Sequence, residues 1–219
     1  MAPLPLQIIN LCAALMLLLS FAMLSQRRVL TLVDLFALQG LVLSISIGVV
    51  AWNTGQPHLY YSAGLTFVLK VVALPLILHR LIRRLDARWE SETLLNIPTT
   101  LMAGLLLVMF SFALAQPISE LATTLTRGTL GIALAVVMLA FLMMITRRKA
   151  VTQVVGFLAM ENGLFFAATS ATYGMPMVVE LGVALDVLVG TVILGIFFFH
   201  IREQFDSLDL SHMESLKED

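Results

Sequence analysis

Residues 150–172 read AVTQVVGFLAMENGLFFAATSAT, and residues 178–201 read VVELGVALDVLVGTVILGIFFFHI. Each run is long enough to cross the hydrocarbon core of a bilayer, which takes about 20 mostly apolar residues in a helix. The first run contains Glu161 and the second contains Asp186. An ionisable side chain near the centre of a spanning helix costs about 2.5–3.5 kcal/mol on insertion scales. Two acids in one helical hairpin therefore predict a role in handling protons or ions.

The composition of the whole chain is that of an integral membrane protein. Of its 219 residues, 59% are hydrophobic and 12% are charged, and the mean hydropathy is +0.97. Soluble domains carry roughly 25% charged residues. The formal net charge of −1 gives no indication of nucleic-acid binding. Cys12 is the one cysteine, which excludes an intrachain disulfide, and no Cys/His cluster in the sequence suggests a metal site.

The chain holds further runs of membrane-spanning length, and they predict an all-α, polytopic transmembrane bundle of seven helices. A β-barrel would instead show strands of about 10 residues with alternating polarity, and the sequence has no such alternation. The predicted spans are 4–25, 29–52, 59–82, 94–115, 128–146, 150–172 and 178–201.

Basic residues between these runs predict the orientation. Lys and Arg concentrate in cytoplasmic loops, so the loops after the first, third, fifth and seventh runs are predicted to be inside, which places the N-terminus outside and the C-terminus inside. The opposite loops hold Arg127 alone. The predicted cytoplasmic cations are Arg27, Arg28, Arg80, Arg83, Arg84, Arg88, Arg147, Arg148, Lys149, Arg202 and Lys217.

The two acids are predicted to lie at similar depth on neighbouring antiparallel helices. At 1.5 Å per residue, Glu161 is about 16 Å from the start of its run and Asp186 about 12 Å from the start of its own. Gly182 and Gly190 flank Asp186 at i−4 and i+4, where small residues let a second helix approach and leave room for water. A desolvated carboxyl can take up and release a proton near neutral pH. The alternative is a purely structural hydrogen bond from a protonated acid.

Two further charged residues lie inside predicted spans. Lys70 is about 16 Å deep and must pair with an acid, face a wet cavity or be neutral. Pro75, five residues later, is expected to kink that helix. Asp34 lies about 7 Å from the cytoplasmic end of the second run, beside Gln39 in the same run. It is either part of a polar path or a charge that favours the helix N-terminus.

The C-terminal part of the chain, from about Gly128 to Asp219, resembles a known family of ion-transport subunits. It is similar to the smallest membrane core subunit of respiratory complex I, the K subunit of the bacterial enzyme, and to the C subunit of multisubunit Na⁺/H⁺ antiporters. That family has three helices, a basic turn, and one buried acid in each of its last two helices; here an Asp stands where the family usually has Glu. The matching stretches are Arg147-Arg148-Lys149, GFLAMEN at 156–162, ALDVLVG at 184–190, His200-Ile201-Arg202 and Asp206-Ser207-Leu208.

Four additional N-terminal helices make the whole chain resemble the hydrogenase-4 component E family, membrane subunits of nickel–iron hydrogenases of the formate hydrogenlyase type. The division that follows is 1–127 for an N-terminal four-helix extension, 128–201 for the K-subunit-like part and 202–219 for an acidic cytoplasmic tail. The resemblance implies a multi-pass subunit of the bacterial inner (cytoplasmic) membrane. Together with the charges found inside the predicted spans, it predicts a proton pathway through Glu161, Asp186, Lys70 and Asp34.

The same resemblance implies what surrounds the chain. It carries no cofactor and is not itself catalytic, because the nickel–iron centre and iron–sulfur clusters belong to other subunits of an oxidoreductase complex. The implied partners are antiporter-like membrane subunits, peripheral hydrogenase subunits on the cytoplasmic side and the lipid bilayer. Two alternatives remain open, namely a subunit of a multisubunit Na⁺/H⁺ antiporter and a structural membrane scaffold. An autonomous transporter is disfavoured, because no inverted repeat with paired broken helices is evident.

Overall fold

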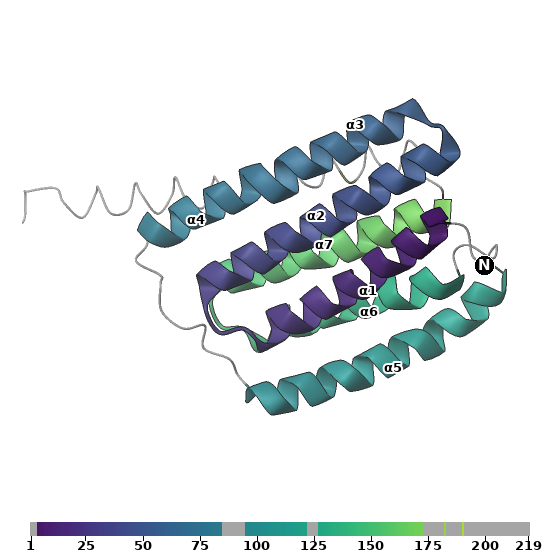
Figure 1. Ribbon diagram of the computed structural model, residues 1–219. Coiled ribbons are helices and arrows are strands. Elements are labelled where there is room, and N and C mark those ends of the chain that lie inside the picture. Colours follow the sequence, from purple (N-terminus) through teal and green to yellow (C-terminus); the bar gives the residue numbers. More distant parts are fainter. Residues whose placement is uncertain (1–3, 85–94, 122–126, 173–181, 183–189, 191–219) are drawn as a thin grey trace, which may run out of the picture.

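The computed structural model describes residues 4–84, 95–121 and 127–172, together with Gly182 and Gly190. Within these residues every regular element is a helix, which confirms the all-α class for this part of the chain (Figure 1). The elements are α1 (Leu4–Ser25), α2 (Val29–Thr54), α3 (Pro57–Thr66), the π-helix η1 (Phe67–Ala73), α4 (Leu74–Arg84), α5 (Ile97–Leu121), α6 (Arg127–Thr146) and α7 (Ala150–Thr172).

Six helices in the described residues are long and apolar enough to cross a membrane, with α3, η1 and α4 forming one continuous helix. Their ends lie within a few residues of the first six predicted spans. The seventh predicted span, 178–201, lies outside the described residues except for Gly182 and Gly190. The count of seven and the orientation with the N-terminus outside therefore stay predictions, as does the division at residue 127.

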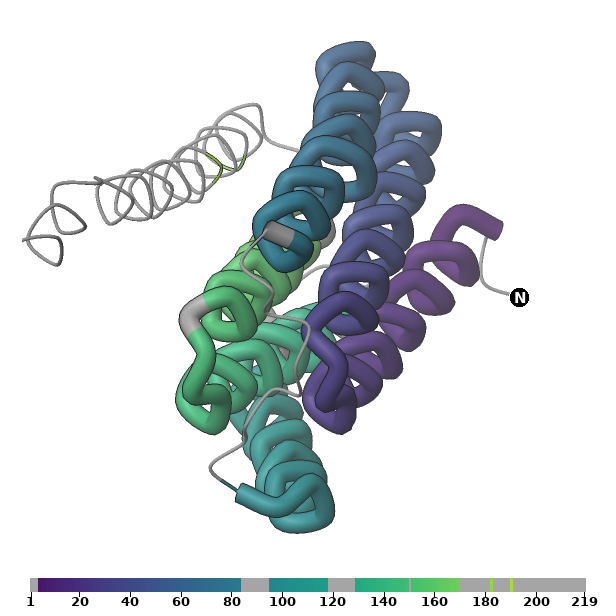
Figure 2. The backbone as a smooth tube through the Cα atoms, turned by 90° about the vertical axis from the view of Figure 1, so that its left-hand side faces the viewer, coloured from purple at the N-terminus to yellow at the C-terminus, as the bar shows by residue number. Residues whose placement is uncertain are grey.

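The helices lie side by side in the bundle (Figures 1 and 2). Helix α2 contacts α1, α7 and all three parts of the α3–η1–α4 helix, while α6 contacts α1, α5 and α7. The α3–η1–α4 helix thus forms one edge of the described bundle and α5 forms the other. Helices from the predicted extension and from the K-subunit-like part pack directly against one another.

Two apolar clusters fill the interior, each drawing on α1, α2, α6, α7 and the α3–η1–α4 helix. We call the cluster near the α1–α2 turn the turn-side cluster, and it includes Met23, Phe36, Leu78, Leu139 and Leu158. We call the other the opposite cluster, and it includes Met16, Leu43, Leu59, Val136 and Phe166.

Buried polar side chains lie between the two apolar clusters. In each contributing helix they fall in sequence after the residues of one cluster and before those of the other. Because the helices alternate in direction, these positions come to the same level of the bundle. We call this set the polar layer; its members are Ser20, Gln39, Lys70, Glu161 and Asn162.

The expected disturbance around Pro75 takes the form of a π-helix just before it. Proline has no N–H, so Pro75 cannot donate to the carbonyl of Val71. In the turn before it, the N–H of Leu74 bonds the carbonyl of Leu69, five residues back, which is the π spacing. Lys70 is the buried residue of this π segment.

Candidate ion-pair site in the bundle interior

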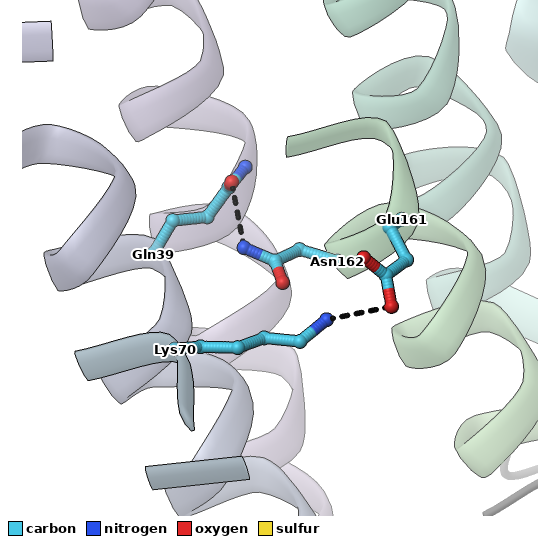
Figure 3. Close-up of polar contacts among 4 residues, drawn as sticks. All are labelled: Gln39, Lys70, Glu161 and Asn162. Atoms are coloured by element: carbon cyan, nitrogen blue, oxygen red, sulfur yellow. Dashed lines mark hydrogen bonds and ion pairs between the residues drawn. The ribbon is translucent and has the colours of Figure 1, made fainter. Parts of the chain in front are cut away.

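Lys70 and Glu161 form an ion pair in the polar layer. Lys70 Nζ lies 3.4 Å from Glu161 Oε1, and the two side chains are only 2% and 3% exposed (Figure 3). Lys70 comes from η1 and Glu161 from α7, so the contact joins residues 91 positions apart. Of the three situations that its depth left open for Lys70, namely pairing with an acid, a wet cavity or a neutral state, the structure shows pairing with an acid of a neighbouring helix. Two charges so deep within apolar helices are electrostatically expensive unless they neutralise each other.

The aromatic ring of Phe165 borders the lysine. Lys70 Nζ lies 5.8 Å from the centre of that ring, within range of a cation–π contact. Phe165 belongs to the opposite cluster and lies one helical turn beyond Glu161 on α7. The ammonium is therefore held between a carboxylate and an aromatic face, in an interior where interactions between charges are strong.

Gly40 on α2 makes the close approach of η1 possible. A Cβ at this position would lie 2.9 Å from Lys70 Cβ and 3.3 Å from the Lys70 carbonyl oxygen. Those distances are shorter than ordinary van der Waals contacts, so any larger residue would push η1 away from α2. Gly40 was not among the residues predicted from the sequence. The pattern that marks it is a glycine next to a polar residue, Gln39, in the middle of a spanning run.

A chain of hydrogen bonds crosses the polar layer beside the ion pair. Gln39 Nε2 donates to Ser20 Oγ at 3.1 Å, and Asn162 Nδ2 donates to Gln39 Oε1 at 3.2 Å. All three side chains are buried, and they come from α1, α2 and α7. The sequence placed Gln39 beside Asp34 and Asn162 in a matching stretch, but neither was assigned a role, and Ser20 was not singled out.

Asp34 lies apart from this layer. Its carboxylate Oδ1 is 3.3 Å from His79 Nε2, and the two side chains are 66% and 26% exposed. The other ring nitrogen, His79 Nδ1, lies 2.9 Å from the Pro75 carbonyl and donates to it, since a carbonyl only accepts. Asp34 is thus part of a separate, largely exposed pair on α2 and α4. Its place in a proton pathway stays a prediction.

Asp186 lies outside the described residues, so its position relative to Glu161 stays a prediction. Its flanking glycines are described: Gly182 lies against the ring of Phe165, and a Cβ on Gly190 would be 3.7 Å from Leu74 Cδ2. Among the residues that the structure describes, no three His, Cys, Asp or Glu side chains gather where they could hold a metal ion.

Arg147 is a second buried cation, far from the polar layer. It lies between α6 and α7 and is 2% exposed. Its Nη2 donates to the carbonyl oxygens of Met23, Leu24 and Gln26 at 3.2, 3.1 and 2.5 Å, at the C-terminal end of α1. Burial, and to a smaller degree the charge of Arg27, lower the pKa of Arg147. This residue joins the α6–α7 turn to the α1–α2 turn.

These features define a class: a multi-pass helical membrane protein with a charge pair at the middle of its bundle. No family model matches the chain, and no solved structure matches it. The chain is 34% identical over 151 residues to the uncharacterized protein Rv0085 of Mycobacterium tuberculosis (strain ATCC 25618 / H37Rv), across 68% of this chain and 69% of that protein.

A match of nearly full length links the chain to a hydrogenase component. It is 26% identical over 211 residues to hydrogenase-4 component E of Escherichia coli strain K12, across 96% of this chain and 97% of that protein. The component E of Shigella flexneri gives the same values. The chain is thus related to hydrogenase-4 component E along nearly its whole length, which confirms the resemblance noted in its sequence.

Proposed function

We propose that this chain is a non-catalytic membrane subunit of a bacterial hydrogenase complex, and that the Lys70–Glu161 pair is one step of a proton path through that complex. The single observation that carries the proposal is the ion pair itself, at 3.4 Å with both side chains almost fully buried. The likeness to hydrogenase-4 component E along nearly the whole chain supports the assignment to a hydrogenase. Redox chemistry of the formate hydrogenlyase type takes place in other subunits.

A buried acid–lysine pair can respond to a single proton. When Glu161 is ionised, its charge compensates that of Lys70. When Glu161 takes up a proton, the ammonium loses this compensation in a medium where an unpaired charge is costly. Proton arrival at Glu161 therefore changes the electrostatic environment of Lys70, and groups beyond the pair respond to that change. A purely structural pair would instead keep one charge state throughout turnover.

The proposed path extends from this pair in two directions. Asp186, expected on the helix after α7, would continue it within the K-subunit-like part. Asp34 would serve it near the cytoplasmic side. The expected neighbours are antiporter-like membrane subunits in the inner membrane and peripheral hydrogenase subunits, which hold the nickel–iron centre and the iron–sulfur clusters.

Glu161→Gln in the purified complex, reconstituted in liposomes, tests the proposal. Gln keeps the shape and hydrogen-bonding capacity of the side chain but cannot exchange a proton. Hydrogen production and proton translocation are measured together. In the fraction of the complex that assembles, we expect proton translocation per hydrogen molecule to fall about tenfold or more, consistent with the loss of a positioned proton-transfer group.

Thr169→Val is the matched control, because Thr169 is also buried on α7 and, among the described residues, its hydroxyl bonds to the carbonyls of Phe165 and Phe166 on its own helix. It should translocate protons like the wild type. Wild-type coupling in Glu161→Gln, at wild-type assembly, would contradict the proposal.

Two other functions fit the same charge pair. A subunit of a Na⁺/H⁺ antiporter would also need buried acids, and a chain that purifies with no hydrogenase subunit would favour it. A structural scaffold would use the pair only for packing, so conservative replacements at Lys70 and Glu161 would leave ion transport unchanged. The likeness to hydrogenase-4 component E favours the hydrogenase complex over both alternatives.

A further inference from the structure

The hydrogen bonds of the polar layer have a fixed direction that begins at Ser20. A serine hydroxyl has one hydrogen, and Ser20 Oγ donates it to the Met16 carbonyl at 2.9 Å. Ser20 can therefore only accept from Gln39, which must present its NH₂ group. The 3.1 Å contact from Gln39 Nε2 has that geometry.

This direction passes on to Asn162. With its nitrogen toward Ser20, Gln39 turns its Oε1 toward α7, where it accepts from Asn162 Nδ2 at 3.2 Å. If the amide of Asn162 were flipped, its Oδ1 would face Gln39 Oε1, and two acceptor oxygens would repel each other. The orientation of an amide is assigned from such a network, and here each link follows from the one before. The carbonyl oxygen of Asn162 is therefore directed away from Gln39.

Asn162 Oδ1 is a buried acceptor with no hydrogen-bond partner among the described residues. Figure 3 shows that this oxygen points to the side of the amide on which Lys70 lies, while the nitrogen points to Gln39. An unsatisfied buried carbonyl is costly, so such a group is expected to meet a donor in some state of the protein. Lys70 carries three N–H donors and lies in the same layer.

We propose that Asn162 Oδ1 is a neutral acceptor for the Lys70 ammonium when Glu161 is protonated, and that Gln39 and Ser20 are positioning residues that aim it. This inference rests on the proposed function. A proton binds a carboxylate oxygen of Glu161 and cancels its charge. Lys70 keeps its own proton, and one of its N–H groups turns from the carboxyl of Glu161 to donate a hydrogen bond to Asn162 Oδ1. The ammonium returns when Glu161 releases the proton.

An amide suits this role for a chemical reason. A carboxylate in its place would compete with Glu161 for the proton, whereas an amide oxygen accepts a hydrogen bond without taking up the proton. The charge-neutral acceptor thus stabilises the protonated state of Glu161 and leaves the proton available for release. Without it, the ammonium would hold Glu161 in its ionised state.

Infrared difference spectroscopy of the purified complex tests this inference. The C=O band of protonated Glu161 is assigned by its disappearance in Glu161→Gln. In Asn162→Leu, of similar size, the ratio of protonated to ionised Glu161 at fixed pH should fall about tenfold, the effect of losing one hydrogen bond to a charged group. Ser20→Ala, which only removes the first link, should lower the ratio by less.

Ser111→Ala is the control, because Ser111 Oγ also bonds a carbonyl of its own helix, that of Leu107 at 2.7 Å, but lies on α5 away from Gln39. It should leave the band unchanged. A wild-type ratio in both Asn162→Leu and Ser20→Ala would overturn the inference while leaving the proposed function standing. The absence of any Glu161 band in the wild-type complex at all pH values and redox states would overturn both.

Discussion

Lys70 and Arg147 are both buried cations of about 2% or less exposure, yet their surroundings differ in kind. Arg147 donates to backbone carbonyls at the end of α1, whereas Lys70 lies beside the carboxylate of Glu161. Carbonyl oxygens of a helix end attract a cation but cannot take up a proton under physiological conditions. A carboxylate can. The first arrangement suits a permanent anchor, and the second suits a site whose charge changes.

The location of each cation agrees with this difference. Arg147 lies where two turns meet, so its contacts fix the ends of helices α1 and α6. Lys70 lies between two apolar clusters at the middle of the bundle, where the cost of an uncompensated charge is greatest. Anchoring alone therefore accounts for a cation at a helix end, while a cation that shares the interior with an acid is a candidate for proton handling.

Removing one charge of the interior pair should have the largest effect on stability. Lys70→Met leaves Glu161 without its cation, and breaking a buried pair in this way costs about 3–5 kcal/mol. The double variant Lys70→Met/Glu161→Gln removes both charges and should recover most of that loss. Thermal unfolding of the purified chain in detergent measures both. A single variant as stable as the wild type would show that the pair is not desolvated.

Arg147→Met should be the next most damaging change. It removes the donor to three carbonyls at the end of α1, and each hydrogen bond to a charged group contributes roughly 1.5–3 kcal/mol. We expect a loss of about 3 kcal/mol with proton coupling preserved in the fraction that assembles. Arg148→Met is the control, because Arg148 is exposed. Equal melting temperatures of the Arg147 and Arg148 variants would show that Arg147 does not anchor the end of α1, and its contrast with the Lys70–Glu161 pair would be lost.

Gly40→Ala should act on the interior pair through the backbone. The new methyl group would overlap Lys70 Cβ and displace η1 from α2, at a cost of about 1–3 kcal/mol for overpacking. Gly48→Ala on the same helix is the control, because a Cβ there meets nothing within 4 Å. We expect only Gly40→Ala to lower both the melting temperature and proton coupling. If the two alanine variants had equal melting temperatures and equal proton coupling, the close packing of η1 against α2 would not matter for either property.

Asp34→Asn should have the smallest effect on stability. Its partner His79 lies on α4, and exposed pairs contribute about 0–1 kcal/mol and weaken with salt. We expect a change in unfolding free energy within about 1 kcal/mol that decreases further as the salt concentration rises. Melting curves at low and high salt provide the measurement. A loss of unfolding free energy as large as that of Lys70→Met would show that the Asp34–His79 pair behaves like a buried ion pair.

The sequence predicted those features that depend on a single helix, namely where each span lies and how deep a charged residue sits within it. Apolar runs located the six described spans, and the depth of Lys70 and Glu161 in their runs placed both at mid-bundle, because rise per residue is fixed. Which residues meet across helices depends on rotation and packing, which a single sequence does not specify. The choice of Glu161 as partner of Lys70 and the role of Gly40 therefore required the structure.

Arg147 is a residue whose burial and contacts could not be predicted from the sequence. By sequence it is one of several cytoplasmic loop cations, and its neighbours Arg148 and Lys149 are the same kind of residue. The structure buries it, because the end of α1 offers carbonyl oxygens next to that turn. No local pattern distinguishes it from Arg148. The direction of the Ser20–Gln39–Asn162 chain likewise became visible only once its three helices were placed together.

Proton translocation by the double variant Lys70→Met/Glu161→Gln tests the central claim most directly, because that variant keeps the interior free of an unpaired charge. The measurement is the number of protons moved per hydrogen molecule by the reconstituted complex, with assembly verified by the presence of every subunit. We predict wild-type assembly and hydrogen production in the absence of a gradient, with proton movement reduced about tenfold or more. Wild-type proton movement in this variant would contradict the claim that the Lys70–Glu161 pair handles protons.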